Sequence, residues 1–207
     1  MSESRISRRR MLQTAGALGV IGALSSSTSA LANDDSDEDE KGERARFRWD
    51  IVSIDFTTLT ASAGGIASAR ANDDSRITLT GSGTFRPGKR KRVTGGGTWS
   101  TTGAAGVGSG AYRVTELVEW HVAPGTFPLT NDAIGDKADA RAGLAVLRVR
   151  YSDQSEGILA VSCQIAGTPP SVFEGITTSR DFVDYWNREA PTGNENRTLF
   201  HVIRDAD

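Results

Sequence analysis

The strongest constraint on the fold is a glycine pattern that occurs three times in the middle of the chain. The stretches TGSGTF (80–85), GGGTW (95–99) and GSGAY (108–112) each place glycines two and four residues before an aromatic side chain. Because strand side chains alternate between two faces, the glycines and the ring share one face. A bare backbone on an inward face allows a sharp bend and leaves room for a ring to lie across it. The pattern therefore predicts strongly curved antiparallel strands.

The rest of the chain after residue 45 also alternates with a period of two, which is typical of strands. Further strand-like stretches occur at 47–56, 65–71, 144–152, 157–166, 172–178 and 197–203. We expect an all-β domain over residues 46–207, a small antiparallel barrel of about eight to nine strands. One stretch differs, because Phe182, Tyr185 and Trp186 follow helical spacing and Pro191 comes after them. It predicts one short C-terminal helix.

The N-terminus carries the three regions of a signal peptide in order. Arg8, Arg9 and Arg10 precede a mildly apolar run over 14–24, and the small-x-small triplet Ala30–Ala32 follows. The apolar run is too short to cross a bilayer, where roughly 20 residues are needed. We expect residues 1–32 to be removed and the protein to keep no stable membrane anchor.

This leader resembles the twin-arginine signal peptides of exported prokaryotic proteins of unassigned function, through Ser7, Arg8, Arg9, Met11 and Leu12. The resemblance implies transport of the folded chain by the twin-arginine translocase and a secreted or extracytoplasmic location.

An acidic segment follows the leader. Six of the seven residues from Asp34 to Glu40 are acidic and none of the seven is apolar. Such a segment cannot bury enough apolar surface to fold, so residues 33–45 are expected to be a disordered linker. The alternating ligands and the glycine of an EF-hand loop are missing.

Composition excludes several classes of function. The chain has 24 basic and 26 acidic side chains and a formal net charge of −2, which argues against a dedicated nucleic-acid partner. Cys163 is the only cysteine, so no intramolecular disulfide can form. Two histidines are too few for a histidine-rich metal site, and no nucleotide loop or standard catalytic motif is present. We expect no metal and no cofactor.

The glycine-rich strands that end in aromatic residues resemble the small barrels of the dirigent and allene oxide cyclase type. The resemblance implies a β-barrel for about half of the chain. No catalytic motif of those families matches residues of this sequence, so the resemblance implies no activity.

Glu116 is the most informative polar residue. Strict alternation along residues 112–122 places it on the inward face between Tyr112 and Trp120. A carboxylate in an apolar row must find a partner, take up a proton or serve a purpose. It is thus a candidate catalytic acid or base. The alternatives are a β-bulge that turns it outward, or an ion pair with an arginine such as Arg148 or Arg150.

A binding site for a small apolar or aromatic ligand, in the barrel or at its mouth, is the preferred interpretation. The long connection over 123–142 is a candidate cover for one mouth of the barrel. The candidate ligand-binding residues are Phe85, Trp99, Tyr112, Glu116, Trp120 and Phe127. An isomerase or cyclase that uses Glu116 is the alternative.

A third interpretation rests on the basic hairpin RPGKRKR. Such a run can bind an anionic polymer of the cell envelope, although it can also be a plain solvated turn. Its candidate anion-binding residues are Arg86, Lys89, Arg90, Lys91 and Arg92. Two other features are expected to be inert, a buried Cys163 thiol and a surface pair of Glu119 and His121.

Overall fold

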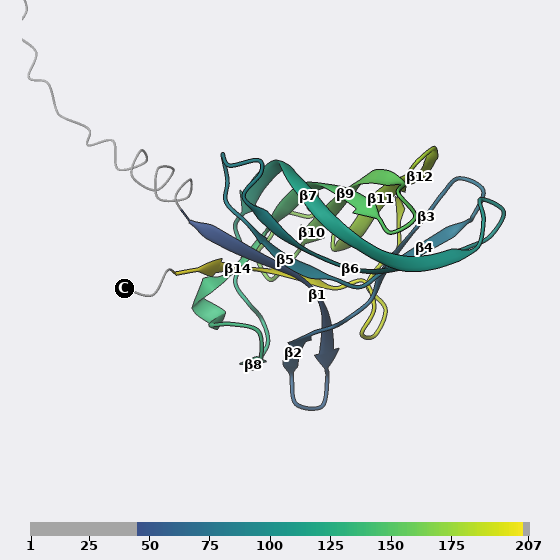
Figure 1. Ribbon diagram of the computed structural model, residues 1–207. Coiled ribbons are helices and arrows are strands. Elements are labelled where there is room, and N and C mark those ends of the chain that lie inside the picture. Colours follow the sequence, from purple (N-terminus) through teal and green to yellow (C-terminus); the bar gives the residue numbers. More distant parts are fainter. Residues whose placement is uncertain (1–44, 205–207) are drawn as a thin grey trace, which may run out of the picture. The chain divides into compact units, whose positions relative to one another are not determined.

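The computed structural model describes residues 45–204, and these form an antiparallel β-barrel with one additional parallel strand pair (Figure 1). The predicted signal peptide and most of the predicted acidic linker lie outside the described residues. The strands are β1 (Arg46–Asp55), β2 (Thr60–Ala63), β3 (Ala67–Arg70), β4 (Arg76–Leu79), β5 (Ser82–Phe85), β6 (Val93–Thr102), β7 (Gly108–Ala123), β8 (Asn131–Asp132), β9 (Ala140–Tyr151), β10 (Glu156–Cys163), β11 (Gly175–Arg180), β12 (Val183–Tyr185), β13 (Asn187–Arg188) and β14 (Thr198–Ile203).

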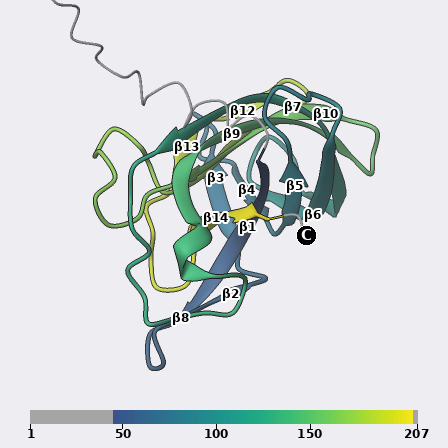
Figure 2. The same ribbon diagram turned by 90° about the vertical axis from the view of Figure 1, so that its left-hand side faces the viewer.

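Six of these strands close a ring of hydrogen-bonded pairs. The order around the ring is β1, β5, β6, β7, β9 and β14, and β14 pairs again with β1. Figure 2 shows β7 and β9 arching over one side of this ring. The closed ring confirms the predicted barrel.

The long strands of the ring change partners along their length, which extends the sheet beyond the ring. Strand β6 pairs with β5 over residues 93–96 and with β4 over residues 99–102. Strand β9 pairs with β14 at residues 140–141 and with β10 over residues 143–150. Strands β3 and β13 continue from β4, and β11 and β12 continue from β10. The number of strands is therefore larger than the predicted eight to nine, because several predicted runs divide where the partner changes. The run RITLTGSGTF, for example, divides into β4 and β5.

Glycines on the inward face leave the space that the aromatic rings occupy, as the sequence predicts. A methyl group on Gly83 would lie 2.7 Å from the indole nitrogen of Trp49, and one on Gly110 would lie 3.0 Å from that of Trp99. At Gly83 and at Gly97 the atom closest to an added methyl group would be a backbone oxygen, that of Thr94 and that of Thr80 respectively. At these positions a side chain would collide with a neighbouring ring or with backbone, so the close packing requires glycine.

Aromatic side chains fill the barrel in two groups. Phe47, Phe85, Trp120 and Phe200 pack inside the six-stranded ring, with ring centroids 4.7–6.3 Å apart. Trp99, Tyr112 and Tyr151 pack under the extension, with centroids 5.7 and 6.1 Å apart. Burial of rings of this size supplies much of the hydrophobic stabilisation.

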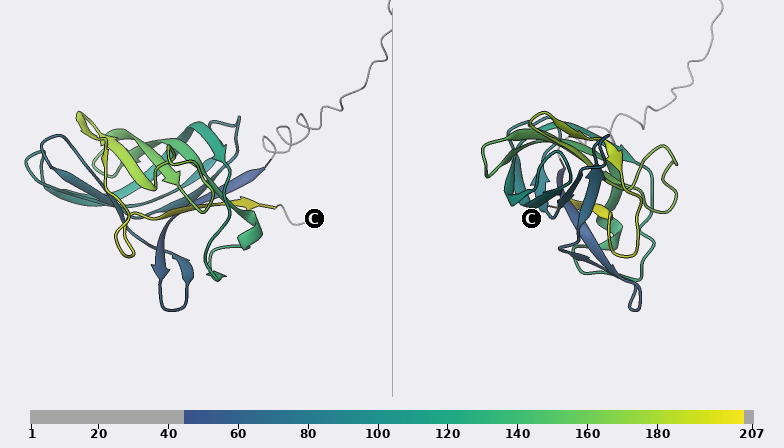
Figure 3. Two further views of the ribbon diagram at one scale, coloured as in Figure 1. Left: turned by 180° about the vertical axis from the view of Figure 1, so that it is seen from behind. Right: turned by 90° about the vertical axis from the view of Figure 1, so that its right-hand side faces the viewer.

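A second apolar layer lies on the outer face of β1 and β14. Side chains alternate along these strands, so Val52, Ile54 and Leu199 point away from the interior that Trp49, Ile51 and Phe200 fill. The β1–β2 hairpin and the covering segment, defined as residues 124–139, lie against this outer face. Figure 3 shows β2 projecting there, on the side opposite to the arch of β7 and β9.

The predicted C-terminal helix is wrong. Residues 175–188 form β11, β12 and β13 instead, and Arg180 pairs with Val183 across a two-residue turn. Asp181 adopts a φ of +50° in this turn, and Phe182 is fully exposed at its tip. Because β11 completes a ladder with β10, sheet pairing overrides the helical spacing of the aromatic residues.

The only helical element among residues 45–204 is a 3₁₀ helix at Lys137–Asp139. That part of the chain has no helix that is both long and apolar enough to cross a membrane.

Candidate ligand-binding site

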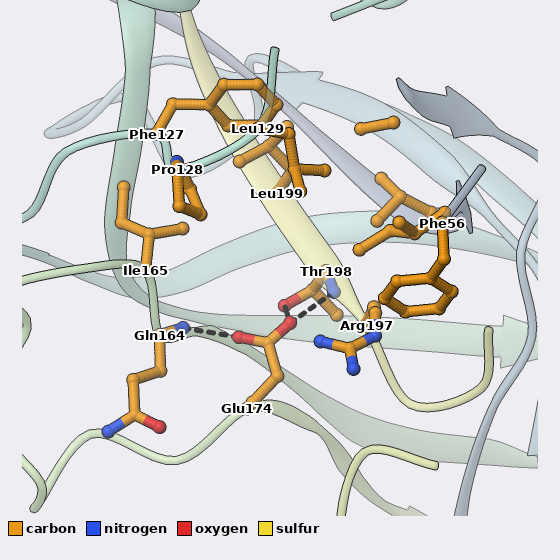
Figure 4. Close-up of a pocket in the computed structure, with 13 residues that line it drawn as sticks. Phe56, Phe127, Pro128, Leu129, Gln164, Ile165, Glu174, Arg197, Thr198 and Leu199 are labelled. Carbon is orange, nitrogen blue, oxygen red and sulfur yellow. Dashed lines mark hydrogen bonds between the residues drawn. The ribbon is translucent and has the colours of Figure 1, made fainter. Parts of the chain in front are cut away.

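A small apolar pocket lies on the outer face of β1 and β14, beneath the covering segment (Figure 4). Its volume is about 110 Å³. Strand β1 and the adjoining residues contribute Val52, Ile54 and Phe56, and the covering segment contributes Phe127, Pro128 and Leu129. The remaining lining residues are Ala61, Gln164, Ile165, Glu174, Arg197, Thr198 and Leu199.

The walls of the pocket are apolar, and its base carries one carboxyl group. Figure 4 shows Phe127, Pro128 and Leu129 on one side, Phe56 and Arg197 on the other, and Glu174 between them at the base. A concave apolar surface with a few polar groups is the usual form of a small-molecule site. The volume is below the roughly 300 Å³ of a site for a drug-sized ligand.

The carboxyl group of Glu174 is fixed by backbone N–H groups from two other segments. Oε1 accepts a hydrogen bond from the Thr198 N–H at 2.6 Å, and Oε2 accepts one from the Gln164 N–H. The Thr198 hydroxyl donates to the Ser162 carbonyl at 2.6 Å and lies 3.3 Å from Oε1. Each carboxylate oxygen can accept two hydrogen bonds, so Oε2 retains capacity for one more.

Burial raises the pKa of Glu174 to about 7, although the hydrogen bonds from Gln164 and Thr198 and the charge of Arg197 act in the opposite direction. Removal from water disfavours the charged form more than these contacts favour it. The carboxyl group therefore exchanges its proton near neutral pH.

Arg197 forms part of the wall between Glu174 and Phe56. Its guanidinium lies 5.4 Å from the centroid of the Phe56 ring, and its Nε donates to the Gly193 carbonyl at 2.9 Å. The side chain is therefore held beside the pocket, where it supplies a positive charge near Glu174.

A buried polar contact holds the covering segment on β14. His201 Nε2 lies 2.7 Å from Asp132 Oδ2, and both side chains are almost completely buried. Asp132 Oδ1 also accepts the N–H groups of Ile134 and Gly135, at 2.9 and 3.2 Å. Because the same segment carries Phe127 and Leu129, this contact helps to position one wall of the pocket.

A second polar pair lies on the same outer face, next to this contact. Arg48 is the cross-strand neighbour of His201, and its Nε donates to Asp50 Oδ2 at 2.7 Å. Asp50 is fully buried, whereas Arg48 is partly exposed. The outer layer thus combines apolar walls with two paired sets of polar side chains.

Of the residues predicted to bind ligand, only Phe127 lines this pocket. Phe85 and Trp120 belong to the aromatic group inside the ring, and Trp99 and Tyr112 belong to the group under the extension. Burial raises the pKa of Tyr112, whose hydroxyl donates to the Thr80 carbonyl at 2.8 Å. The structure does not bring these residues together into one site.

Two β-bulges turn Glu116 to the outer face of β7, where it is nevertheless largely buried, with 8% of its surface exposed. Register shifts fall between Val114 and Glu116 and between Leu117 and Glu119. Glu116 is opposite the partly exposed Arg148, whereas Leu117 is opposite the buried Leu147. Val118, also predicted to face inward, is exposed. The structure contains both of the predicted alternatives, a bulge that turns Glu116 outward and an ion pair with Arg148.

Glu116 instead pairs with the basic hairpin. Its Oε2 accepts a hydrogen bond from Lys91 at 3.0 Å, its Oε1 pairs with Arg90, and Arg148 lies 4.0 Å away. The hydrogen bond from Lys91 and the charge of Arg90 lower its pKa despite partial burial. The carboxyl group is therefore held in the ionised form, which does not favour a role as a general acid near neutral pH.

Two minor predictions are confirmed. Cys163 is fully buried, and burial raises the pKa of its thiol well above the ordinary value. Glu119 and His121 form an exposed pair at 2.9 Å. No group of three or more histidine, cysteine or acidic side chains in residues 45–204 could hold a metal ion.

Sequence reasoning missed Glu174 and Arg197. Glu174 is a lone acidic residue in the apolar stretch VFEGI, which is the same kind of signal that drew attention to Glu116. Its partners at 164 and 198 are close only in the folded chain, so the sequence offers no local pattern that would identify the pocket.

Comparisons of the chain with protein-family models, with curated proteins and with solved structures find no match. The function therefore has to be inferred from the geometry of the site.

Proposed function

We propose that this protein binds a small, mainly apolar molecule, or the apolar end of a larger one, in the pocket beneath the covering segment. The observation that carries the proposal is the combination of apolar walls with the single buried carboxyl group of Glu174. The pocket supplies hydrophobic contact on several sides, and Glu174 Oε2 supplies an acceptor for one O–H or N–H group of the ligand.

The size of the pocket limits the ligand. An enclosed apolar cavity of about 150 Å³ is sufficient for benzene. The pocket of about 110 Å³ is somewhat smaller but partly open, so a single ring with one polar substituent matches its dimensions and chemistry. This moves the expected binding site from the barrel interior to its outer face.

The proposal is tested with two matched fluorinated probes, 4-fluorophenol and 4-fluorotoluene, followed by ¹⁹F and ¹H–¹⁵N NMR. Both probes should shift the amide signals of Gln164 and Thr198, whose N–H groups contact Glu174. The phenol should bind more tightly, because only the phenol can donate a hydrogen bond to the carboxylate. Mass spectrometry of the native protein would then identify the natural ligand.

A pocket-filling variant with a matched control makes the test specific. Ile165→Trp places a large ring at the pocket, whereas Val107→Trp makes a comparable change at an exposed turn residue that does not line it. Probe affinity should fall at least tenfold in the first variant and stay unchanged in the second. Equal probe affinity in the two variants would exclude this pocket as the binding site. NMR shifts confined to residues around the aromatic groups inside the barrel would exclude it as well.

An acid–base enzyme is the second candidate, with Glu174 in place of Glu116. A pKa of about 7 suits proton transfer near neutral pH. We rank this candidate second because both oxygens of Glu174 already hold backbone N–H groups, which gives the residue a structural role. A substrate whose turnover followed a group of pKa near 7, and was lost in Glu174→Gln, would reverse the ranking.

We also propose that the protein acts outside the cytoplasm after twin-arginine export. The support is the order of regions in residues 1–32, where paired arginines precede a mildly apolar run and a small-x-small triplet. Replacing Arg8, Arg9 and Arg10 together with lysine should leave the precursor inside the cell. Fractionation that found normal secretion of this variant would refute the proposal.

A further inference from the structure

Arg197 brings a positive charge with free N–H groups to the edge of the apolar pocket. Its Nε donates to the Gly193 carbonyl at 2.9 Å, and its guanidinium lies 5.4 Å from the centroid of the Phe56 ring. In the described part of the chain, no hydrogen bond or ion pair occupies its two terminal nitrogens, Nη1 and Nη2. Because Arg197 lines the pocket, these N–H groups are available to a ligand.

Arg197 and Glu174 both line the pocket but do not form an ion pair with each other (Figure 4). The charge of Arg197 acts to lower the pKa of Glu174, so the two groups are near enough to interact. Burial still raises this pKa to about 7, whereas a direct ion pair with an arginine usually lowers the pKa of a carboxyl group. A ligand in the pocket can therefore contact both groups and complete the pairing that they lack.

The other groups that face Glu174 carry no charge near neutral pH. The lining residues from β1 and from the covering segment are apolar, and Gln164 and Thr198 are uncharged. Cys163 at the end of β10 is a further titratable group, and burial together with the charge of Glu174 raises the pKa of its thiol well above the ordinary value. The charge at this end of the pocket is therefore set by Arg197 and Glu174.

We propose that the ligand of the apolar pocket is a small carboxylic acid, whose carboxylate binds the Nη groups of Arg197 and shares one proton with Glu174. This inference rests on the proposed function, because it assigns a chemical class to the ligand of the same pocket. A guanidinium binds a carboxylate through two parallel N–H···O bonds. Each carboxylate oxygen has two lone pairs, so an oxygen that accepts from Arg197 can also share a proton with Glu174 Oε2.

The charges of the pocket favour an acid over an amine. A ligand ammonium group would be repelled by Arg197, whereas a carboxylate is attracted to it. Two carboxyl groups in contact cannot both be ionised, so the pair formed by the ligand and Glu174 retains one proton. The apolar body of the ligand then packs against Phe127, Pro128 and Ile165, on the opposite side of the pocket from Arg197.

Binding of a carboxylate above pH 7 must take up one proton from the buffer. In that range Glu174 is ionised in the free protein, and the free ligand is ionised because the ordinary pKa of a carboxyl group is about 4. The complex holds one proton between them, so the affinity should fall about tenfold between pH 6 and pH 8. A phenol should show the opposite trend, because it donates its own proton to the ionised form of Glu174.

The first test uses the native full chain with 4-fluorobenzoate, and with 4-fluorophenol, 4-fluorotoluene and 4-fluorobenzylamine for comparison. Affinities are measured by ¹⁹F NMR at pH 6, 7 and 8. Calorimetry at pH 8 in two buffers with different enthalpies of ionisation counts the protons that are taken up. We expect 4-fluorobenzoate to bind with an uptake close to one proton and to lose affinity as the pH rises, while 4-fluorophenol gains affinity.

The second test removes the positive charge at the pocket and compares a matched control. Arg197→Gln removes the charge and the free Nη groups, whereas Arg113→Gln removes an exposed arginine that does not line the pocket. The affinity for 4-fluorobenzoate should fall at least tenfold in the first variant and less than twofold in the second. The affinity for 4-fluorotoluene depends on the apolar walls, so it should change less than threefold in both variants.

Several outcomes would overturn the assignment of a carboxylic acid and leave the apolar pocket in place. These are binding of 4-fluorotoluene without binding of 4-fluorobenzoate, binding of 4-fluorobenzoate without proton uptake, equal loss in the two arginine variants, and tighter binding of 4-fluorobenzylamine. Failure of all four probes to bind would overturn the pocket and the carboxylic acid together. If Arg197→Gln also loses 4-fluorotoluene, the proton uptake of the native protein decides.

Discussion

His201 Nε2 lies 2.7 Å from Asp132 Oδ2, and this contact joins the last strand of the barrel to the segment that walls the apolar pocket. His201 Nδ1 is buried and has no hydrogen-bond partner among the described residues. The contact therefore defines the orientation of the imidazole ring, because only one of its two nitrogens is paired.

Asp132→Asn should weaken this contact and loosen the covering segment. Asp132 Oδ1 already accepts two backbone N–H groups, so the new amide nitrogen would face His201 and force the ring proton onto the unpaired Nδ1. We expect a loss of about 1–3 kcal/mol in the free energy of unfolding, as for an unsatisfied buried polar group. Amide hydrogen exchange should become faster in residues 127–134.

Asp136→Asn is the matched control, since Asp136 accepts a backbone N–H group in the same segment but is exposed. A uniform change in hydrogen exchange across the barrel, with no excess in the covering segment, would contradict the role given to Asp132.

Gly83→Leu should destabilise the barrel, because the space above Gly83 is already filled. A Cβ atom there would lie 2.7 Å from Trp49 Nε1 and would also meet the Thr94 carbonyl. Overpacking of this kind costs about 1–3 kcal/mol. Ser82→Leu tests the neighbouring residue, which is partly exposed and points to the other face. If the melting temperature fell equally in the two variants, the tight packing above Gly83 on the inward face would not be the cause of the loss.

Glu116→Gln should loosen the basic hairpin without affecting the apolar pocket. Glu116 contacts Arg90 and Lys91 and does not line the pocket, so the melting temperature should fall while the affinity for 4-fluorophenol stays the same. The fall should become smaller at high salt, because salt screens partly exposed ion pairs. Glu119→Gln, at a more exposed pair, should have a smaller effect. Loss of probe binding in Glu116→Gln would restore the functional interpretation of this residue.

Glu174 predicts an unusual dependence of stability on pH. Its pKa is about 7 in the folded protein and has an ordinary value of 4.5, so the folded state binds more protons between these values. The free energy of unfolding should therefore fall as the pH rises from 4.5 to 7, by roughly 3 kcal/mol from this group. Denaturant unfolding of the native protein and of Glu174→Gln at pH 4.5, 6 and 7.5 measures the difference. If the difference in the free energy of unfolding stayed constant from pH 4.5 to 7.5, the pKa of Glu174 would be the same in the folded and unfolded states.

The sequence was sufficient to predict the barrel because the signal for its curvature is local. Glycines and rings that share a face of one strand predict that a ring packs closely on bare backbone. The contacts of Gly83 and Gly110 with tryptophan rings confirm this packing. The bulges in β7 are not local in this sense. They depend on the register with β9, so strict alternation assigned Glu116 and Val118 to the wrong face.

The pocket was harder to predict for a related reason. Phe127 was identified because it occurs in an unusually long connection between strands. Glu174 and its N–H donors at 164 and 198 come from three separate segments. They come together only because β10 and β14 both pair with β9, and no spacing in the sequence encodes that arrangement.

The pairing of β1 with β14 has a consequence for the synthesis of the protein. Arg46 is opposite Ile203, so the first and last strands of the described chain form one seam of the ring. The ring cannot close until β14 has left the ribosome, and until then β1 presents an unpaired edge over residues 46–51 and β9 lacks a partner at Ala140 and Arg141. Truncation by even one strand at the C-terminus should therefore produce an aggregating chain rather than a smaller barrel.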